Sequence, residues 1–286
     1  MSSSLRSATT PLGLRITGPH NSFIDHMPSI DQNRRIWNTD QYWKAAGDEW
    51  SITWGGAAAQ WEGALLPRIR AFLPAGHILE IAPGYGRWTQ FLAAQCKTLT
   101  VVDLSAKCIA VCRDRFAELG HVRYHVNDGL SLAMLPDQTI DFAFSFDSLV
   151  HAELPVIESY LRELARVLTP DGAAFLHHSN LGSFGPPGVA RRWLPSSLCM
   201  WLMARRIIPN DHWRAYSVSA DRVRDLAASA GMPCIRQELV NWGCARLSDC
   251  FSTLTPVGSR WTQPLQRVEN PRFMAEAEAI RASVSG

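Results

Sequence analysis

Apolar and polar positions follow a regular order between residues 77 and 179. Five short runs are rich in apolar and β-branched residues, and they span 77–82, 98–104, 121–126, 140–146 and 172–179. Runs of this length and composition predict buried strands. Three stretches with helical spacing lie among them, at 87–95, 105–119 and 154–168. Because strands that alternate with helices are joined by crossover connections, the pattern predicts a parallel sheet with helices on both of its faces.

The last third of the chain predicts how the sheet ends. Residues 219–231 begin with a serine that can cap a helix and end with a glycine that can stop one. The segments 234–242 and 244–256 are suited to a closing antiparallel hairpin. Together with the five earlier strands, this predicts an α/β fold: a Rossmann-like, seven-stranded, mostly parallel sheet with a terminal antiparallel hairpin.

Three further segments complete the expected domain organisation. Residues 1–35 mix Ser, Thr, Pro and Gly with few large apolar groups, which predicts a mobile N-terminal arm. Residues 36–75 predict a helical cover, and residues 76–286 form the main domain. Residues 181–217 interrupt the strand–helix order with Gly, Pro, Arg and Trp, so they are expected to form an inserted lid over the acceptor.

Composition narrows the possible classes of partner and compartment. The chain is 47% hydrophobic and its net charge is +2, so a full core is expected and nucleic acid is not. No run approaches the length of a membrane-spanning helix, which argues against stable membrane insertion. Seven cysteines form no Cys-x-x-Cys pair, and the first 35 residues lack a secretory apolar core. We therefore expect reduced thiols in a cytoplasmic protein, with a homodimer as the default assembly.

The residues that follow each strand predict a ligand site, since ligands of open parallel sheets bind beyond the carboxyl ends of the strands. Residues 82–86 supply two glycines that let a ligand approach the backbone. Asp103 follows the second strand and can accept both hydroxyls of a ribose, while 127–129 follows the third. A plain turn and an NAD site share some of these features. However, residues 181–286 supply no second mononucleotide half, so a mononucleoside fits better.

Four segments in these positions resemble the class I S-adenosylmethionine (SAM)-dependent methyltransferases. They are E-I-A-P-G-Y-G-R-W-T (80–89), V-V-D-L-S (101–105), V-N-D-G (126–129) and F-S-F-D-S-L-V-H (144–151). The resemblance covers residues 77 to about 180 and implies SAM as the cofactor. The contacts it implies are Glu80, Ala82, Gly84 and Gly86 at the methionine part, Asp103 and Leu104 at the ribose, Asn127, Asp128 and Gly129 at the adenine, and Phe146 beside them. Ala82 stands where the family has its first glycine.

Three other segments resemble bacterial sugar O-methyltransferases, including those that act on mannosides in polysaccharide synthesis. They are 47–55, 176–180 and 212–220. This resemblance implies a carbohydrate acceptor: a mannoside, a polysaccharide precursor or a glycolipid. A polyketide, phenol or amine acceptor remains an alternative with the same cofactor. A non-catalytic nucleoside-binding scaffold is a further alternative, and it needs no base.

A sugar hydroxyl is a poor nucleophile at neutral pH, so transfer to it needs alignment and a base. Asp147 and His151 leave the fourth strand at i and i+4, which places them on one face if they form a helical turn. We predict His151 as the general base, with Asp147 orienting it or the acceptor. Asp147 and Asp128 are also possible ligands of Mg²⁺, although no strong ligand motif supports a metal.

Acceptor contacts are expected from the cover, the fifth strand and the lid. The candidates are Glu49, Trp50, His178, Asn180, His212, Arg214 and Tyr216. Glu49 and Trp50 lie beside Gly47, a possible hinge, and are candidates for a lid over the cofactor. Of the adjacent pair His177 and His178, the second is assigned to the site and the first to the core, because neighbouring strand residues face opposite sides. Most members of the tryptophan cluster at 37–61 are expected to pack in the core.

Overall fold

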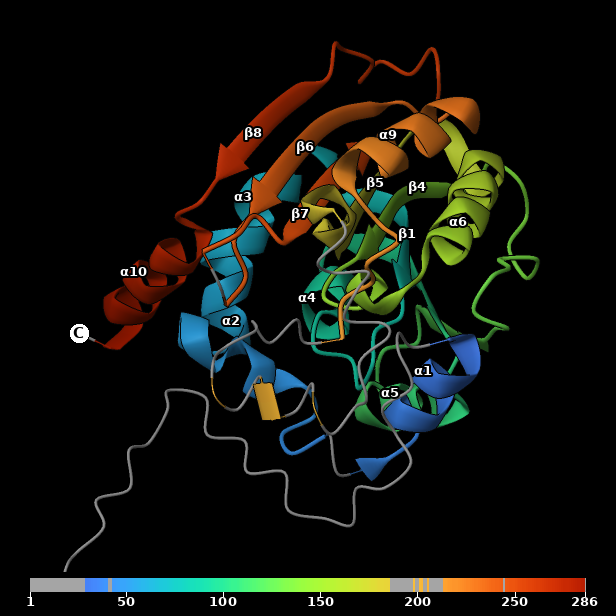
Figure 1. Cartoon of the computed structure of the whole chain (residues 1–286). Helices are drawn as coiled ribbons and strands as arrows, with labels where there is room; N and C mark the ends of the chain where they lie inside the picture. Colours follow the sequence, from blue (N-terminus) through green and yellow to red (C-terminus); the bar gives the residue numbers. More distant parts are fainter. Residues whose placement is uncertain are drawn as a thin grey trace, which may run out of the picture.

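A computed structural model of the chain shows one eight-stranded sheet with helices on both faces (Figure 1). The structure describes residues 29–40, 43–185, 198, 201–202, 205, 213–243 and 245–285. The strands follow the order β3-β2-β1-β4-β5-β7-β6-β8. Their bounds are β1 Ala75–Ile81, β2 Cys96–Asp103, β3 Val122–Val126, β4 Ile140–Ser145, β5 Leu168–Ser179, β6 Cys234–Val240, β7 Asp249–Leu254 and β8 Gln266–Asn270.

The predicted fold class is confirmed, with a correction to the number of strands. Strands β1 to β5 are parallel to one another, and β7 runs antiparallel to both of its neighbours, β5 and β6. The eighth strand, β8, pairs in parallel with β6 at the edge of the sheet. Its sequence, Q-R-V-E-N, is almost wholly exposed. An edge strand of this kind carries no buried apolar run, so hydrophobic patterning missed it.

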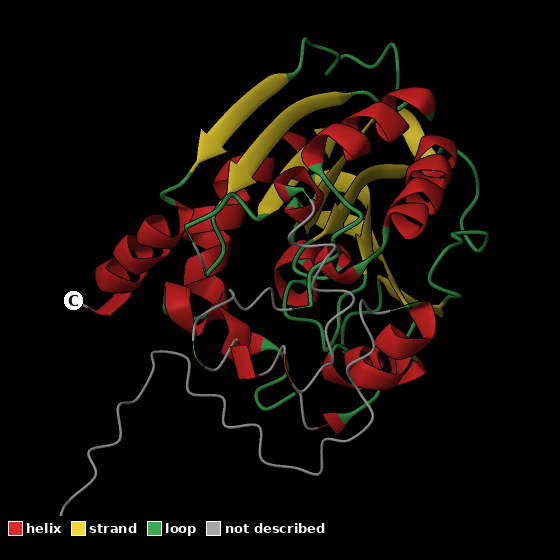
Figure 2. Cartoon of the chain, viewed as in Figure 1, coloured by secondary structure: helices red, strands yellow, loops and turns green. Residues whose placement is uncertain are grey.

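Helices cover the two faces of the sheet unequally (Figure 2). Their bounds are α1 Ile30–Trp37, α2 Ala57–Gln60, α3 Leu66–Ile69, α4 Thr89–Ala93, α5 Ala106–Arg115, α6 Leu154–Val167, α9 Ala220–Ser229 and α10 Phe273–Ser285. One face packs against α6 and α9, where Leu161 and Val223 are fully buried. The other face packs against α2, α3, α4 and α10, in a core that contains Trp61 and Phe144. The parallel strands are therefore buried from both sides, as their continuous apolar runs predict.

The N-terminal segments fold over the carboxyl ends of the strands. Helix α1 has a capping box in which Ser29 accepts from the backbone N–H of Gln32 and the Gln32 side chain accepts from the backbone N–H of Ser29. Residues 30–35 are thus helical, which corrects the expectation that the arm extends to residue 35; residues 1–28 of that arm lie outside the described residues. Helical turns then run through 48–54, 57–69 and 70–72, where a cover was expected.

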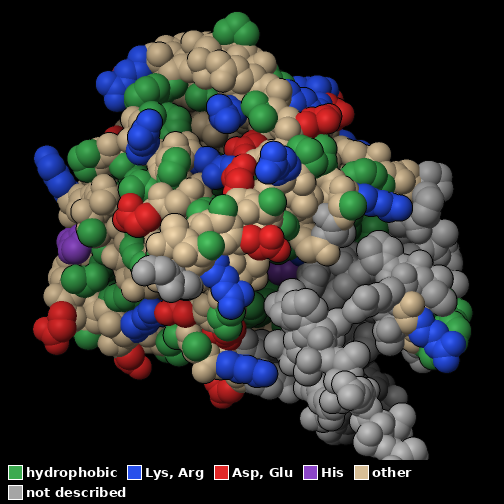
Figure 3. Space-filling model, turned by 90° about the vertical axis from the view of Figure 1, so that its left-hand side faces the viewer, with side chains coloured by type: hydrophobic (Ala, Val, Ile, Leu, Met, Phe, Trp, Pro, Cys, Tyr) green, Lys and Arg blue, Asp and Glu red, His purple; other side chains and the backbone are tan. Residues whose placement is uncertain are grey.

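The C-terminal helix α10 was not predicted from the sequence, and it packs on the helical cover. Two glycines of the cover allow this close approach: a Cβ on Gly63 would lie 2.8 Å from Ile280, and one on Gly55 would lie 2.7 Å from Val284. Figure 1 shows α10 beside α2, far from α6 and α9. On the face that carries α10 and β8, acidic and basic side chains are interspersed (Figure 3).

The predicted lid is described only at its two ends. Its first residues form a short turn, Leu181–Phe184, and most of 186–212 lies outside the described residues. The chain returns at residues 213–217, where the backbone N–H of Ala215 donates to the carbonyl of Val150 at 2.9 Å. Within the described part of the chain, no helix has the length and apolar character that crossing a bilayer requires.

Candidate active site

A cavity of about 250 Å³ lies at the carboxyl ends of β1, β2 and β4. The strand order changes direction between β1 and β4, which is where open α/β sheets bind ligands. We call the wall made by the strand-end loops the floor: it includes Ala82, Pro83, Gly84, Asp103, Leu104, Gly129, Phe146, Asp147, Ser148 and Leu149. We call the opposite wall the roof: it consists of Ser29, Ile30, Asn33, Trp37, Trp43, Gly47 and Trp50.

The loop after β1 takes a left-handed backbone that brings it close to the roof. Ala82 has φ +57° and Gly84 has φ +59°. A Cβ on Gly84 would lie 2.4 Å from the Trp43 ring, so only glycine fits there. The alanine that replaces the family's glycine keeps the left-handed conformation, and its carbonyl accepts a hydrogen bond from the Ser148 hydroxyl at 2.7 Å. This contact ties the first strand-end loop to the fourth.

Asp103 presents a buried carboxylate to the cavity at the end of β2. Its Oδ1 accepts from the backbone N–H of Ser105 at 2.8 Å, and its Oδ2 accepts from that of Gly84 at 3.3 Å. Burial raises the pKa of Asp103 to about 7, although these N–H donors oppose the shift. A carboxylate with lone pairs left over beside a glycine loop suits the hydroxyls of a ribose.

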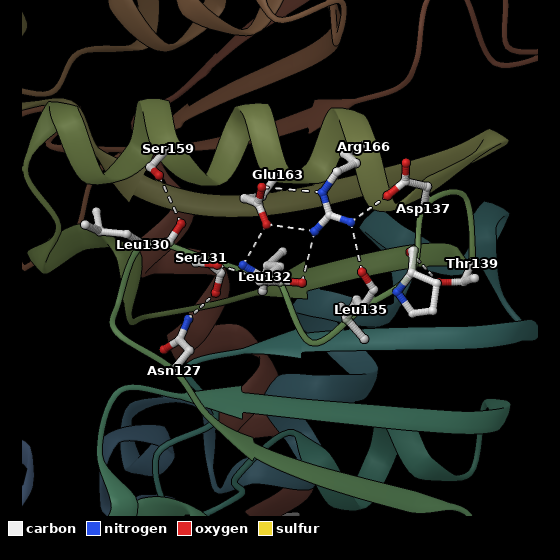
Figure 4. A network of polar contacts seen from close by, with 12 residues as sticks. Asn127, Leu130, Ser131, Leu132, Leu135, Asp137, Thr139, Ser159, Glu163 and Arg166 are labelled. Atoms are coloured by element: carbon white, nitrogen blue, oxygen red, sulfur yellow. Dashed lines mark hydrogen bonds and ion pairs between the residues drawn. The ribbon is translucent and has the colours of Figure 1, made fainter.

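The loop after β3 contributes less to the cavity than expected. Asn127 turns its side chain into its own loop, where Nδ2 donates to the Ser131 carbonyl at 2.9 Å (Figure 4). Asp128 is exposed, and its Oδ1 accepts from the backbone N–H groups of Leu130 and Ser131. Of the three residues expected at the adenine, only Gly129 lines the cavity. Both side chains instead form hydrogen bonds within the loop itself.

Glu80 and Gly86 also lie away from the cavity. The Glu80 side chain is buried, and its Oε2 accepts from the Thr89 hydroxyl at 2.6 Å. Its Oε1 is buried with no partner among the described residues, and burial raises the pKa of Glu80 to about 8. A Cβ on Gly86 would lie 2.4 Å from the Phe116 ring, so this glycine permits close packing against a helix. Both residues support the floor from behind and do not line it.

Three tryptophans of the cluster form most of the roof. Trp37, Trp43 and Trp50 contact one another edge to face, with ring centroids 5.0–5.9 Å apart. Trp43 also stacks on Tyr85 of the floor loop at 4.0 Å. Only Trp54 and Trp61 of the five are buried in the core, where most of the cluster was expected. Glu49 accepts from the backbone N–H groups of Lys44 and Ala45 and does not line the cavity.

The turn after β4 does not have the geometry expected for Asp147 and His151. Asp147 is left-handed at φ +61° and precedes the short helix Leu149–His151, so the two side chains do not share one helical face. The Asp147 carboxylate instead pairs with Arg87 at 2.8 Å. Burial favours a higher pKa for Asp147, but the positive charges of Arg87 and Arg214 hold it below its usual value. Asp147 therefore presents a charged carboxylate to the cavity and does not hydrogen-bond to His151 in the described structure.

A backbone carbonyl orients His151. Nδ1 of His151 lies 3.2 Å from the carbonyl oxygen of Trp213, and a carbonyl can only accept, so Nδ1 carries the proton and Nε2 carries a lone pair. The ring packs against Trp37 of the roof at 5.5 Å. Desolvation and the positive charge of Arg214 lower the pKa of His151 to about 4. The imidazole is therefore neutral near pH 7 and can accept a proton, but a pKa this low makes it a weak base in the free protein.

Arg87 is a site residue that the sequence argument did not single out. It lies between the rings of Trp50 and Trp88, with its guanidinium carbon 5.5 and 4.6 Å from their centroids. One of its nitrogens donates to the Ser51 hydroxyl at 3.3 Å, and another binds Asp147. Its position directly after the glycine turn could have identified Arg87 as a site residue from the sequence. Arg87 joins the cover to the turn after β4.

Most of the expected acceptor contacts lie behind the cavity wall. His178 is buried, with Nε2 2.8 Å from the Ser252 hydroxyl, and its pKa is lowered to about 4 by burial. Asn180 caps neighbouring backbone: its Oδ1 accepts from Ala220 N–H and its Nδ2 donates to the Leu247 carbonyl. On β5 it is the side chain of His177, and not that of His178, that contacts the turn after β4.

The three lid candidates do not complete an acceptor site either. Arg214 is buried and forms a two-pronged ion pair with Asp249. Neither Arg214 nor Tyr216 lines the cavity, and His212 lies outside the described residues. Within the described part of the chain, no group of three or more His, Cys, Asp or Glu side chains is placed to hold a metal ion. The described residues therefore supply no set of ligands for a Mg²⁺ ion at Asp147.

The comparisons with known proteins agree with the strand-end site. Residues 78–172 match the family model described as a methyltransferase domain. These residues form a SAM-dependent methyltransferase domain. The residues present fit this cofactor, because Gly84 leaves room beside Trp43 and Asp103 offers a buried acceptor for ribose hydroxyls. The expectation of a class I domain and of SAM is confirmed.

Three relatives show how far the likeness extends. Nodulation protein S of Sinorhizobium fredii (strain NBRC 101917 / NGR234) is 27% identical over 129 residues, which are 45% of this chain and 59% of that protein. The PH0226 protein of Pyrococcus horikoshii OT3 has a TM-score of 0.54 at 18% identity, covering 78% of this chain and 98% of that one. The N-methyltransferase NodS of Bradyrhizobium japonicum WM9, in complex with S-adenosyl-L-homocysteine, has a TM-score of 0.52 at 16% identity, covering 80% and 99%. The two structures show the fold, and none of the three is named as a sugar O-methyltransferase.

Proposed function

We propose that the protein transfers a methyl group from SAM to a small acceptor held in the cavity between roof and floor. The observation that carries this proposal is the continuity of one cavity from Gly84 and Asp103 to Asp147 and Leu149. Donor and acceptor would thus share one space that the roof shields from water. Bound SAM supplies a methyl group on a sulfonium, which is already a good leaving group. The protein's task is then to align the acceptor and to take up its proton.

For the acceptor atom, we propose a hydroxyl oxygen, with a carbohydrate as the class of acceptor. His151 does not itself line the cavity, but Leu149 and Ala152 on either side of it do, and its neutral ring keeps a lone pair on Nε2 for the hydroxyl proton. Trp37, Trp43 and Trp50 provide flat apolar surfaces of the kind that stack on a sugar ring. The charged Asp147 carboxylate can accept a hydrogen bond from a neighbouring hydroxyl group of the acceptor. The resemblance to sugar O-methyltransferases remains a second support, independent of this geometry.

An amine is a second candidate acceptor, favoured by the charges of the cavity wall. Asp103, Asp147 and Glu153 line the cavity, while Arg87 is the single Lys or Arg among its described lining residues and is already paired with Asp147. Carboxylates beside aromatic faces attract ammonium groups. One of the similar structures is named as an N-methyltransferase. An ammonium group must lose a proton before its nitrogen can attack the methyl group, and the lining carboxylates can accept that proton without His151.

The experiment has a binding step and a transfer step. S-adenosylhomocysteine is expected to bind the full-length protein in calorimetry, and NAD is not; no uptake of S-adenosylhomocysteine by folded protein would overturn the proposal. Purified protein is then incubated with SAM and matched acceptors, such as a mannoside and the corresponding amino sugar, and the methylated product is located by mass spectrometry. The variant His151→Gln separates the candidates. It is expected to slow hydroxyl methylation by about 100-fold or more, but to slow amine methylation far less.

A further inference from the structure

We propose that Asp249, at the start of β7, is a positioning residue that sets both Asp147 and His151 through two separate hydrogen-bonded branches. The proposal rests on the proposed function, in which these two side chains face the acceptor. Asp249 is fully buried and does not line the cavity. It is 98 residues beyond His151 in the chain, so the link exists only in the folded sheet. Strand β7 pairs with β5, which brings Asp249 opposite Ser179 and next to His177.

The first branch runs from Asp249 to Asp147 through His177. The backbone N–H of Asp147 donates to Nδ1 of His177 at 3.0 Å, so this nitrogen carries the lone pair. Nε2 must then carry the proton, and it lies 2.8 Å from Oδ2 of Asp249. Asp147 is left-handed at φ +61°, a conformation that costs a non-glycine residue free energy. The His177 contact therefore holds Asp147 in a backbone geometry that its own sequence disfavours.

The second branch runs from Asp249 to His151 through Arg214. Nε and Nη2 of Arg214 bind the two carboxylate oxygens of Asp249 at 2.5 and 2.7 Å. The residues on either side of Arg214 both bind the turn that carries His151. Trp213 accepts from Nδ1 of His151 through its carbonyl oxygen, and the backbone N–H of Ala215 donates to the Val150 carbonyl at 2.9 Å. Anchoring Arg214 thus fixes the carbonyl that selects the His151 tautomer.

A second two-pronged ion pair in the described structure has no hydrogen-bonded branches to the turn after β4. Arg68 binds Glu238 with the same two-pronged geometry, at 2.9 and 2.6 Å, and Glu238 is also buried. Neither residue lines the cavity. A buried ion pair is no more stabilising than well-packed apolar side chains, so stability alone does not explain why Asp249 sits behind the turn after β4. The two branches that leave Asp249 give it a role that Glu238 lacks.

The test compares Asp249→Asn with the matched control Glu238→Gln in the full-length protein labelled uniformly with ¹⁵N. In the wild type, NMR is expected to show His177 protonated on Nε2 and His151 protonated on Nδ1. In Asp249→Asn, His151 is expected to become a mixture of tautomers, and the amide signal of Asp147 is expected to shift. Glu238→Gln should lose stability to a similar degree but leave both histidines unchanged. A single, unchanged His151 tautomer in folded Asp249→Asn would overturn the proposal.

Binding and kinetics separate this proposal from the proposed function. S-adenosylhomocysteine affinity is expected to stay within about twofold in Asp249→Asn, because the Gly84–Asp103 contacts are untouched. With the acceptor found in the panel, kcat is expected to fall about 100-fold with little change in the KM for SAM. If the wild type binds no S-adenosylhomocysteine, the proposed function fails while the tautomer result still decides the positioning role. An unchanged kcat overturns the positioning role alone.

Single-branch variants keep the test decisive if Asp249→Asn does not fold. His177→Gln can accept from Asp147 through its amide oxygen and donate to Asp249, so it is expected to retain more activity than His177→Phe. Arg214→Lys keeps the charge but loses the two-pronged contact, and it is expected to disturb His151 while the Asp147 amide signal stays in place. Equal losses in His177→Gln and His177→Phe, or an undisturbed His151 in Arg214→Lys, would contradict the two-branch arrangement.

Discussion

The floor and the roof of the cavity are built by different means. In the floor, Asp103 is held by backbone N–H groups from its own turn and from the neighbouring strand-end loop. The roof is joined to the floor by contacts between segments far apart in the chain. The Ser105 hydroxyl donates to Asn38 at 2.6 Å, Tyr85 donates to Asp40 at 3.2 Å, and Asn33 donates to the His151 carbonyl at 3.2 Å. The floor therefore follows from backbone geometry, whereas the roof depends on side chains that meet only after folding.

This difference assigns different tasks to the two walls. The floor offers a carboxylate and free space beside a glycine, which are the features that bind a nucleoside. The roof offers aromatic rings, which exclude water and lengthen the time that a ligand stays bound. We therefore expect floor variants to change cofactor affinity most, and roof variants to change it less.

The largest expected effect is on the floor. Asp103→Ala should weaken S-adenosylhomocysteine binding by about 10- to 100-fold, because the ribose hydroxyls lose their buried hydrogen-bond acceptor. Isothermal titration calorimetry measures the change. Asp128→Ala is the matched control, since that side chain is exposed and bonded to its own loop. It should leave affinity within about twofold. If both variants lost the same affinity, the floor carboxylate would contribute no more to binding than the exposed loop carboxylate.

The next effect concerns the support beneath the floor and depends on pH. Burial raises the pKa of Glu80 from 4.5 to about 8, so the folded protein retains a proton that the unfolded chain loses. The Glu80 contribution to stability is complete below the unfolded pKa and is lost as pH rises through the folded pKa. Glu80→Gln mimics the protonated acid, so its melting temperature should gain on the wild type between about pH 5 and about pH 9.

A carboxylate with the opposite shift is the control for Glu80→Gln. The hydrogen bond from Arg166 lowers the pKa of Glu163, which stabilises the fold above the unfolded pKa and not below it (Figure 4). Glu163→Gln should therefore lose stability relative to the wild type as pH rises up to about 5, and by a constant amount above that. Thermal unfolding of the two variants across a pH series that extends down to about pH 3 gives both slopes, that of Glu163→Gln below about pH 5 and that of Glu80→Gln above it. Parallel curves for Glu80→Gln and the wild type would show that Glu80 is ionised in the fold.

A smaller effect is expected from the roof. Trp50→Ala removes ring contacts to Trp37 and Trp43 and uncovers Arg87, so S-adenosylhomocysteine should bind about 3- to 10-fold more weakly. Stopped-flow measurements should place most of this loss in the dissociation rate. Trp261→Ala is the control, because Trp261 packs against Phe72 and does not line the cavity. If Trp50→Ala weakened binding as much as Asp103→Ala, the roof would contribute as much to cofactor affinity as the floor.

The smallest effect tests the backbone of the floor. Ala82→Gly should raise the free energy of unfolding by up to about 1 kcal/mol, because glycine adopts φ +57° without the strain that a Cβ adds. Chemical denaturation measures the gain. Gln138→Gly is the control, since Gln138 is exposed at φ +53°. Both variants should gain stability, with cofactor affinity unchanged. A loss of stability in Ala82→Gly alone would mean that the alanine methyl packs favourably.

Much of the fold and half of the site follow from local patterns. Apolar runs identify seven of the strands, and the Ser105 and Ser219 caps mark two helix starts correctly. The glycine turn and Asp103 identify the floor, because the ends of parallel strands always meet at one edge. The sequence missed α10 and β8, since one has a weak amphipathic pattern and the other is exposed. It also chose His178 over His177, because strand alternation alone does not say which face a residue takes.

By itself, the amino-acid sequence determined the strand–helix order, the glycine turn after β1 and the acidic residue after β2, since each depends on residues close together in the chain. Only the tertiary structure decided that three tryptophans close the cavity, that Arg87 and not His151 partners Asp147, and that His177 is the histidine behind the turn after β4. The physical reason is distance along the chain. Hydrogen bonds and ring contacts between remote residues depend on how strands pair and on which side each residue faces, and local patterns carry no information about either.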